Sequence, residues 1–288
     1  IHGASPSLTA GAPAVGTLRG SGSAVAVTDV VLLSPSEAGL ERIIVARALP
    51  DGFSPAVLEE AALAASAKRT EPRRDLRALP TVTIDAAHSR DLDDALAVLP
   101  AEPDGALRLF VSIADVDAFV PAGGALDAEA RRRGTSVYLA GRVLPMVPPS
   151  LSEEAASLNP GVDRPAVTVE LRIDVEGAVQ SVDVYESLVR SAARLTYDDV
   201  ATFLDGAQED VIPEALRPTL RWLRTAGARL STARAARGGV EVLDDEAYVT
   251  LDAHTGEPLA IEARRTTSAH RLVERLMVAA NEAVAGWL

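Results

Sequence analysis

The segment that most constrains the fold is RPAVTVELRIDVEGAVQSVDVYESLV, residues 164–189. Apolar and polar residues alternate in both of its halves, which is the pattern of a β-strand that buries one face. Glu176 and Gly177 lie between the halves, where a turn would reverse the chain. The segment therefore predicts a hairpin of two strands and commits this part of the chain to a β-sheet.

Strands and helices are predicted on both sides of this hairpin, in no regular order. Predicted strands lie at 81–85, 93–100, 107–116, 246–252 and 258–264, and predicted helices lie at 54–67, 123–134, 195–206 and 267–288. Capping residues support two of the helices, because Ser54 precedes Pro55 and Thr196 lies three residues before Asp199. Irregular alternation of this kind predicts the α+β class, with mixed or antiparallel sheets and packed helices.

Three further segments have less regular patterns. Residues 41–50 carry a strand-like apolar run. Residues 137–158 are rich in proline and predict an irregular chain, and residues 214–239 predict a pair of basic helices.

Composition divides the chain into three parts. Residues 1–50 predict a small β-rich element, residues 51–78 predict a helix and a charged linker, and residues 79–288 predict a larger domain. The chain begins at Ile1 and ends within the predicted helix 267–288, so we expect it to be part of a longer product.

The composition also excludes several kinds of protein. The chain has no cysteine, which excludes disulfides and thiolate metal sites and gives no sign of a secreted scaffold. No apolar run approaches the roughly 18 residues that span a bilayer. The net charge of −13 argues against a general binder of polyanions. We therefore expect a cytoplasmic, monomeric protein with no membrane contact.

Four aspartates, which we call the acidic cluster, lie within ten positions of one another: Asp85, Asp91, Asp93 and Asp94. Two like charges 4 Å apart repel by roughly 4 kcal/mol at an effective dielectric constant of about 20, so the cluster needs compensation. A strand end, a tight turn and a strand start can bring the four carboxylates together. Carboxylate oxygens without thiol or imidazole neighbours suit Mg²⁺ or Mn²⁺, and two such ions about 4 Å apart can clamp a phosphodiester.

The acidic cluster could also exist without a catalytic metal. A solvated, aspartate-rich loop is common and stays open as an alternative. A calcium loop of the EF-hand kind would need glycine at its sixth position, where counting from Asp91 gives Leu96. His88 lies inside the acidic segment, and we expect it to be a turn residue.

The acidic segment TVTIDAAHSRDLDDAL resembles the signature of the RNB catalytic domain, which occurs in the ribonuclease II and ribonuclease R family of 3′→5′ exoribonucleases. Further similar segments follow in order, namely VSIADVDAFVPAGGALDAEARRRGTSVYL, VLPMVPPSLSEEAASLNPGVDRPAVTVELRID and SAHRLVERLMVAANEAVA. The resemblance covers about residues 79–288. It implies an RNB-type catalytic domain that is truncated at its C-terminal end, since the family's Thr-Ser-Pro-x-Arg-Arg-Tyr stretch and S1 domain are not in the sequence.

The resemblance also implies site residues. By matching position, Asp85, Asp91, Asp93 and Asp94 would be the catalytic carboxylates and the ligands of Mg²⁺, with Mn²⁺ as a second candidate ion. Three further residues would bind RNA: Tyr138 as an aromatic face for a base, Glu274 beside the terminal nucleotides, and Asn281 on the same helix face.

The implied function is Mg²⁺-dependent hydrolysis of single-stranded RNA from its 3′ end to nucleoside 5′-monophosphates. Two alternatives stay open: a catalytically silent module that binds RNA or acts as a scaffold, and a metal-dependent phosphohydrolase that acts on nucleotides or DNA. The arginines of residues 214–239 either form a solvated helix face or line an RNA channel; these are Arg217, Arg221, Arg224, Arg229, Arg234 and Arg237.

Overall fold

The computed structural model describes residues 14–21, 24–32, 35–67, 71–100, 103–240, 246–252, 257–264 and 266–288. The chain forms two compact units whose segments interleave along the sequence. The first unit takes Ile1–Phe53, Thr135–Met146 and Glu246–Arg264, and the second takes Ser54–Gly134, Val147–Asp245 and Arg265–Leu288. All four residues of the acidic cluster lie in the second unit.

The first unit contains three two-stranded antiparallel sheets and one helix among its described residues. Its strands are β1 (Ala14–Ser21), β2 (Ala24–Leu32), β7 (Val137–Leu139), β8 (Arg142–Leu144), β11 (Glu246–Leu251) and β12 (Pro258–Arg264), and its helix is α1 (Pro35–Ala46). Each sheet is a hairpin of consecutive strands. Within this unit the Arg142 guanidinium binds the carboxylates of Glu41 and Asp51, which ties the β8 strand to the segment around α1.

The second unit is built on a six-stranded mixed sheet with the strand order β3-β10-β4-β5-β6-β9. The strands are β3 (Arg74–Asp75), β4 (Thr81–Asp85), β5 (Asp94–Leu99), β6 (Leu107–Ala114), β9 (Asp163–Ile173) and β10 (Val179–Thr196). Strand β10 is long enough to pair with β9 along its first part and with β4 along its last part. Because β10 pairs with both β4 and β9, the strands β10, β4, β5, β6 and β9 form a closed circle of hydrogen-bonded neighbours.

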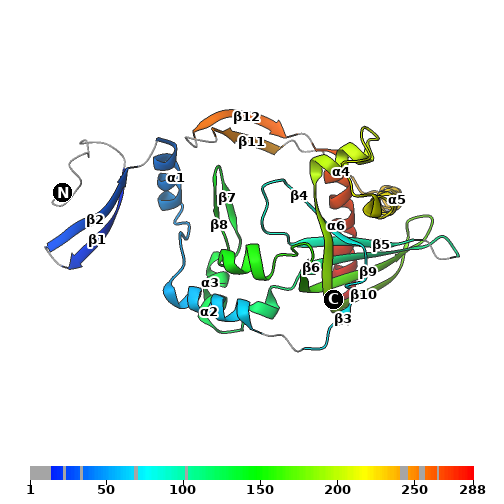
Figure 1. The fold of residues 1–288 in the computed structure, drawn as a ribbon, viewed down its shortest axis with the longest axis horizontal. Helices are drawn as coiled ribbons and strands as arrows, with labels where there is room; N and C mark the ends of the chain where they lie inside the picture. Colours follow the sequence, from blue (N-terminus) through cyan, green and yellow to red (C-terminus); the bar gives the residue numbers. More distant parts are fainter. Residues whose placement is uncertain are drawn as a thin grey trace. The chain divides into compact units, whose positions relative to one another are not determined.

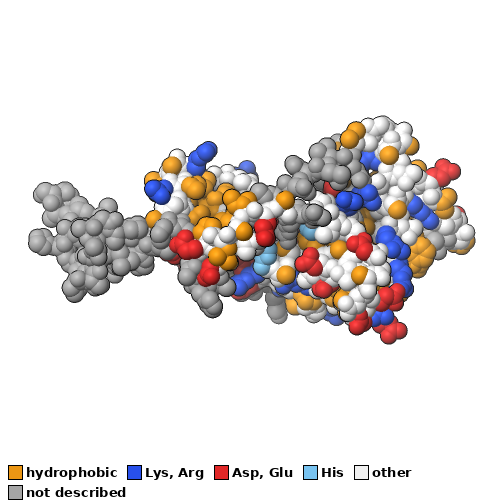
Figure 2. All heavy atoms as spheres, turned by 90° about the horizontal axis from the view of Figure 1, so that it is seen from above, with side chains coloured by type: hydrophobic (Ala, Val, Ile, Leu, Met, Phe, Trp, Pro, Cys, Tyr) orange, Lys and Arg blue, Asp and Glu red, His pale blue; other side chains and the backbone are white. Residues whose placement is uncertain are grey.

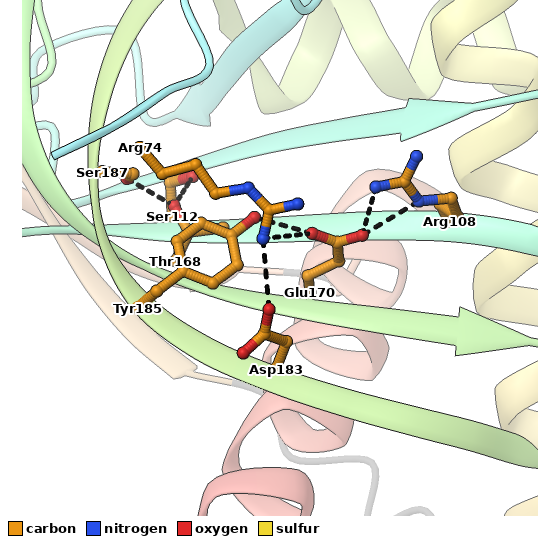
Figure 3. Close-up of polar contacts among 8 residues, drawn as sticks. All are labelled: Arg74, Arg108, Ser112, Thr168, Glu170, Asp183, Tyr185 and Ser187. Atoms are coloured by element: carbon orange, nitrogen blue, oxygen red, sulfur yellow. Dashed lines mark hydrogen bonds and ion pairs between the residues drawn. The ribbon is translucent and has the colours of Figure 1, made fainter.

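Strands β9 and β10 form the predicted hairpin, and the period-2 pattern decides which residues face which side. Val169, Leu171 and Ile173 belong to the larger core, whereas Thr168 and Glu170 face the opposite side of the sheet. Figure 3 shows the polar contacts on that opposite side. Glu170 lies between Arg74 and Arg108, and the hydroxyls of Ser112, Thr168 and Ser187 form a hydrogen-bonded row.

Three helices cover the face of the sheet that carries the larger core (Figure 1). They are α4 (Tyr197–Leu204), α5 (Arg217–Ala236) and α6 (Ser268–Trp287). The predicted cap of α4 is confirmed, because the Thr196 hydroxyl accepts from the Asp199 N–H. Leu220 and Leu223 of α5 and Leu276 of α6 are fully buried, so the apolar faces of these helices hold them on the sheet.

A smaller core on the opposite face anchors the loops of the second unit. Leu76, Leu92, Phe110, Leu158 and Val189 are its larger members. The helices α2 (Pro55–Ser66) and α3 (Ala125–Arg133) pack on each other, and a short π-helical turn, η2 (Ser150–Ala155), leads into Leu158. The predicted start of α2 is confirmed, since the Ser54 hydroxyl accepts from the Val57 N–H.

The structure corrects three expectations about local conformation. Residues 41–50 are not a strand, because their first part completes helix α1. Residues 137–158 are not irregular throughout, because they begin with the β7–β8 hairpin, where Gly141 supplies the positive φ of the turn. Residues 214–239 form one long helix, α5, after a short 3₁₀ turn, instead of a pair. Within the described residues, no helix is long and apolar enough to cross a membrane.

Candidate active site at the ends of two neighbouring strands

The acidic cluster lies where β4 ends and β5 begins. The two strands are antiparallel neighbours that pair at Val82 and Leu96, and they diverge toward the cluster. Asp85 is the last residue of β4 and Asp94 is the first residue of β5. Residues 86–93, which we call the acidic loop, connect them at one edge of the sheet. The predicted sequence of strand end, turn and strand start is therefore confirmed.

The acidic loop alternates between buried and accessible side chains. Leu92 is 1% exposed and belongs to the smaller core, whereas Asp93 is exposed and Asp91 is half-buried. Because Leu92 points into the protein, the two aspartates beside it are directed away from the core. The Asp93 carbonyl accepts from the Ala114 N–H at 2.8 Å, which joins the end of the loop to β6. His88 lies in an exposed turn of the loop, as predicted.

The four carboxylates influence one another electrostatically. Burial, followed by the charges of Asp85 and Asp93, raises the pKa of Asp94 to about 6. Although Asp93 as a whole residue is exposed, the protein atoms around its carboxylate partly desolvate it, and this, followed by the charges of Asp91 and Asp85, raises the pKa of Asp93 to about 6 as well. Burial also raises the pKa of Asp85; the neighbouring Thr83 side chain and the charge of Arg194 oppose this shift, and the charge of Asp91 adds to it. The side chains are thus close enough to disfavour ionisation of their neighbours.

Two carboxylate oxygens in the cluster are buried without a hydrogen-bond partner: Oδ2 of Asp85 and Oδ2 of Asp94. A buried, ionised oxygen without a donor is costly, so this arrangement suits a cation. Among the described residues, no three acidic or histidine side chains are already arranged as a complete metal-binding group. Mg²⁺ does not require one, because it keeps water ligands and shares its shell with substrate phosphate. The donors present therefore fit a hard divalent cation.

A stability measurement can test this electrostatic strain. Without divalent ions, Asp94→Asn is expected to raise the free energy of unfolding at pH 7 by about 1–2 kcal/mol, less than the full shift implies because Asp94 is only half-buried. The pKa of Asp94 is about 6 in the folded state and 3.8 ordinarily. The destabilisation is therefore absent below pH 4, grows between pH 4 and 6, and is complete above pH 6. Urea titrations in EDTA at pH 4 and pH 7 measure this destabilisation. The prediction is contradicted if, at pH 7, Asp94→Asn is no more stable than the wild type.

The remaining predicted site residues lie on different elements. Glu274 and Asn281 are both exposed on α6, and seven helical positions bring them to nearly the same face. The N-terminal turn of α6 is fixed near the acidic edge, because His270 stacks on Tyr197 with ring centroids 4.0 Å apart. Tyr197 directly follows Thr196, the residue that pairs with Asp85. Glu274 thus lies one helical turn beyond this contact.

Tyr138 belongs to the first unit, where it lies in β7 with 64% of its surface exposed. The two units are described separately, so the structure does not bring Tyr138 together with the acidic cluster. An exposed aromatic face is nevertheless what base stacking requires.

The arginines of α5 are largely engaged within the protein. Arg224 donates to the Leu204 carbonyl, and Arg229 donates to the carbonyls of Gly105 and Asp174. Arg221 pairs with Glu209, and both Arg234 and Arg237 pair with Glu282. Arg217 donates to the Ile212 carbonyl. Figure 2 shows basic and acidic side chains interspersed on the visible face. Several of these arginines therefore have partners within the chain, and the pairs with Glu209 and Glu282 lie on the surface.

Two residues that hold the acidic loop were not predicted from the sequence. Arg194 of β10 donates to the carbonyls of Ala86 and Ala87, and Ser157 makes two hydrogen bonds to the second half of the loop. Ser157 lies within a segment that resembles the family, but its burial and its contacts are tertiary. No pattern along the chain marks Arg194.

Comparison with known proteins defines the class of this chain. The RNB domain family matches residues 73–288, and the chain therefore belongs to this family.

Relatives narrow the comparison to ribonuclease R. The chain is 40% identical to ribonuclease R of Aquifex aeolicus over 215 residues, which cover 74% of this chain and 30% of that protein. It is similar to the structure of Mycoplasma genitalium RNase R in complex with ribose methylated single-stranded RNA, with a TM-score of 0.83 and 30% identity over 92% of this chain and 41% of that one. Yeast Ssd1, a pseudonuclease, shares the fold alone, with a TM-score of 0.58 and 19% identity over 83% of this chain and 27% of that one. The chain spans about a third of the length of its curated relatives.

Proposed function

We propose that this protein is a Mg²⁺-dependent 3′→5′ exoribonuclease that hydrolyses single-stranded RNA to nucleoside 5′-monophosphates. The observation that carries the proposal is the acidic cluster, in which four coupled carboxylates include two buried oxygens without a hydrogen-bond partner. Membership of the RNB family and similarity to ribonuclease R supply the reaction class. RNA as substrate is supported by the RNase R structure that contains single-stranded RNA.

The residues of the acidic cluster would have different roles in the reaction. Asp85 and Asp94 would hold Mg²⁺ through their unpartnered oxygens, with Asp91 and Asp93 completing the acidic surface. When bound, Mg²⁺ supplies charge neutralisation for the phosphate and activation of the attacking water. Asp93 is the exposed member of the cluster, so its carboxylate orients the water that approaches from solvent. Leu92 and the β6 contact keep the loop backbone in place while this happens.

Three exposed side chains, those of Tyr138, Glu274 and Asn281, are the proposed RNA-binding groups. Tyr138 offers an aromatic face, and stacking contributes roughly 1–3 kcal/mol per base without demanding a sequence. Glu274 and Asn281 present polar groups on α6, one to three turns beyond the His270 contact at the acidic edge.

A silent RNA-binding module is the second candidate, and the fold alone does not exclude it, because a pseudonuclease has the same fold. The filled acidic positions argue against it, since a scaffold gains nothing from a cluster in which the pKa values of Asp85, Asp93 and Asp94 are raised. A phosphohydrolase that acts on nucleotides or DNA could use the same acidic cluster, so only its substrate distinguishes it from the proposed exoribonuclease.

One experiment distinguishes the three functions. The whole protein is incubated with 5′-labelled single-stranded RNA, single-stranded DNA or a mononucleotide, each with Mg²⁺ and with EDTA. We expect stepwise shortening of RNA from the 3′ end in Mg²⁺ and none in EDTA, with nucleoside 5′-monophosphates as products. Binding of RNA without shortening would support the silent module, and equal turnover of DNA or of the mononucleotide would support the phosphohydrolase.

A further inference from the structure

Ser157 contacts the acidic loop on both sides of Asp91. Its hydroxyl donates to the Arg90 carbonyl at 2.9 Å and accepts from the Leu92 N–H at 3.0 Å. The Arg90 carbonyl belongs to the peptide group before Asp91, and the Leu92 N–H belongs to the peptide group after it. Since these two planes set the direction of the Asp91 Cα–Cβ bond, one hydroxyl fixes the direction in which this side chain leaves the backbone. Ser157 is 0% exposed, so water cannot replace it at this position.

The residue after Ser157 extends this contact toward Asp93. The Leu158 N–H donates to the Leu92 carbonyl at 2.9 Å, and that carbonyl belongs to the peptide group before Asp93. The side chains of Leu92 and Leu158 are both buried in the smaller core. Residues 157–158 therefore hold three consecutive peptide groups of the loop, and the core holds the side chain between the two aspartates.

The segment that carries Ser157 is itself fixed to the sheet. Arg164 of β9 donates from Nε to the Ser157 carbonyl at 2.9 Å and from Nη2 to the Glu154 carbonyl at 2.8 Å. The π-helical turn η2 ends just before Ser157, and turns of this kind occur frequently at functional sites. The position of the Ser157 hydroxyl is thus determined by β9 and not by the loop it contacts.

Arg194 holds the first half of the loop. Its Nη2 donates to the Ala86 carbonyl at 3.0 Å and to the Ala87 carbonyl at 2.7 Å. Arg194 pairs with Thr83 in the adjacent strand, two residues before Asp85, so it spans the turn that follows Asp85. Its backbone belongs to β10, which keeps the guanidinium in place even though the side chain is exposed.

We propose that Ser157 and Arg194 are positioning residues, which hold the backbone of the acidic loop so that the carboxylates of the acidic cluster stay near one another before metal or RNA binds. Mutual repulsion would otherwise open a loop that carries this much negative charge. Neither residue is placed at the reacting atoms: Ser157 acts through the loop backbone, and Arg194 holds two loop carbonyls while its positive charge also favours the ionised form of Asp85. The inference rests on the proposed function, because it assigns these residues to the same site.

The test uses Ser157→Ala in the whole protein. Loss of a group that orients metal ligands typically lowers metal affinity or activity by 10–100-fold, and we expect this reduction in kcat and in Mn²⁺ affinity. The KM for RNA should stay within about threefold, because RNA-binding groups are untouched. Binding of Mn²⁺ is followed by electron paramagnetic resonance, independently of turnover. Ser157→Thr keeps the hydroxyl and should recover part of both losses.

Ser187→Ala is the matched control. Ser187 is also 0% exposed, shares a hydrogen bond with the Thr168 hydroxyl at 2.7 Å and donates to the Ala166 carbonyl at 3.2 Å (Figure 3). It lies nine residues before Thr196 on β10, about 30 Å along the strand. This variant should lose similar stability while keeping wild-type kcat and Mn²⁺ affinity.

The outcomes separate the inference from the proposed function. If Ser157→Ala keeps wild-type kcat and Mn²⁺ affinity, or loses no more of either than Ser187→Ala, Ser157 is not a positioning residue. If the wild-type protein does not shorten RNA, the proposed function fails, and the Mn²⁺ titrations still test the loop. Should Ser157→Ala not fold, Arg194→Lys decides, because it keeps the positive charge near Asp85 and removes the guanidinium that reaches the Ala86 and Ala87 carbonyls. It should lower Mn²⁺ affinity severalfold, and an unchanged affinity overturns the inference.

Discussion

Replacement of Asp93 by asparagine in the whole protein is expected to leave binding of single-stranded RNA intact and to slow its hydrolysis by at least about 10²–10³-fold. Asp93 is the exposed carboxylate of the acidic cluster, so it faces the solvent from which water must come. Asparagine has nearly the same shape and removes only the negative charge. The variant therefore removes charge from the reaction without disturbing the loop, whose backbone contacts through Ala114 and Leu158 remain.

Two measurements are needed for this variant. Single-turnover shortening of a 5′-labelled oligonucleotide reports the chemical step, and fluorescence anisotropy of the same oligonucleotide reports binding. Asp210→Asn is the control, because Asp210 is exposed in a turn before α5 and should be replaceable without effect on either quantity. Wild-type hydrolysis by Asp93→Asn would show that this carboxylate is not part of the active site.

Removal of the Asp115 side chain is expected to cost about 3–5 kcal/mol of unfolding free energy. Asp115 follows β6 and receives the Arg73 guanidinium at 2.6 Å, with side chains only 7% and 9% exposed. Asp115 also accepts from the Ala118 N–H, which shapes the turn after the strand. Asp115→Ala would leave the buried guanidinium with only the longer contact to Glu186 at 3.8 Å and the Ala166 carbonyl.

The double variant Arg73→Met/Asp115→Leu separates the pair from its surroundings. Because it removes both charges and keeps the volume, it should be more stable than Asp115→Ala alone. Urea titrations of the wild type and of both variants give the comparison. A cost below about 1 kcal/mol for Asp115→Ala would mean that solvent reaches Arg73 in the folded protein.

The parts of the fold that could be predicted from the sequence depend on short-range patterns. Alternation in residues 164–189 predicts the β9–β10 hairpin because side-chain direction in a strand has a period of two. Thr196 predicts the start of α4 because its hydroxyl satisfies a backbone N–H only three residues away. The α+β class follows from such elements, and the mixed sheet confirms it.

The parts that could not be predicted depend on contacts between distant residues. The apolar run in residues 41–50 is compatible with a strand or a helix, and only the protein around it selects α1. The interleaving of the two units has no local signal, since each unit is made of three separate segments. The long β10 changes partners from β9 to β4 along its length, which no single-strand pattern encodes.

In the candidate site, too, residues close together in the sequence could be predicted, and contacts between distant residues could not. The four aspartates lie within one short segment, so their density marked a candidate cation site, and the resemblance to the RNB domain supplied their catalytic role. Their support comes from Ser157 and Arg194, which are 65 to 108 residues away in the chain. The arginines of residues 214–239 had the spacing of a binding surface, yet they have partners within the chain, such as the Leu204 carbonyl and the exposed Glu282 carboxylate. Spacing therefore located charges correctly without revealing what they contact.

The central claim is that divalent cations compensate the acidic cluster, and a crystal of the whole protein grown with Mn²⁺ and a short single-stranded RNA tests it most directly. Anomalous diffraction locates Mn²⁺ without reference to activity. We predict an anomalous peak at the Oδ2 atoms of Asp85 and Asp94, between the protein and a phosphate of the RNA. A structure with RNA bound and no peak at these carboxylates, at millimolar Mn²⁺, would contradict the claim.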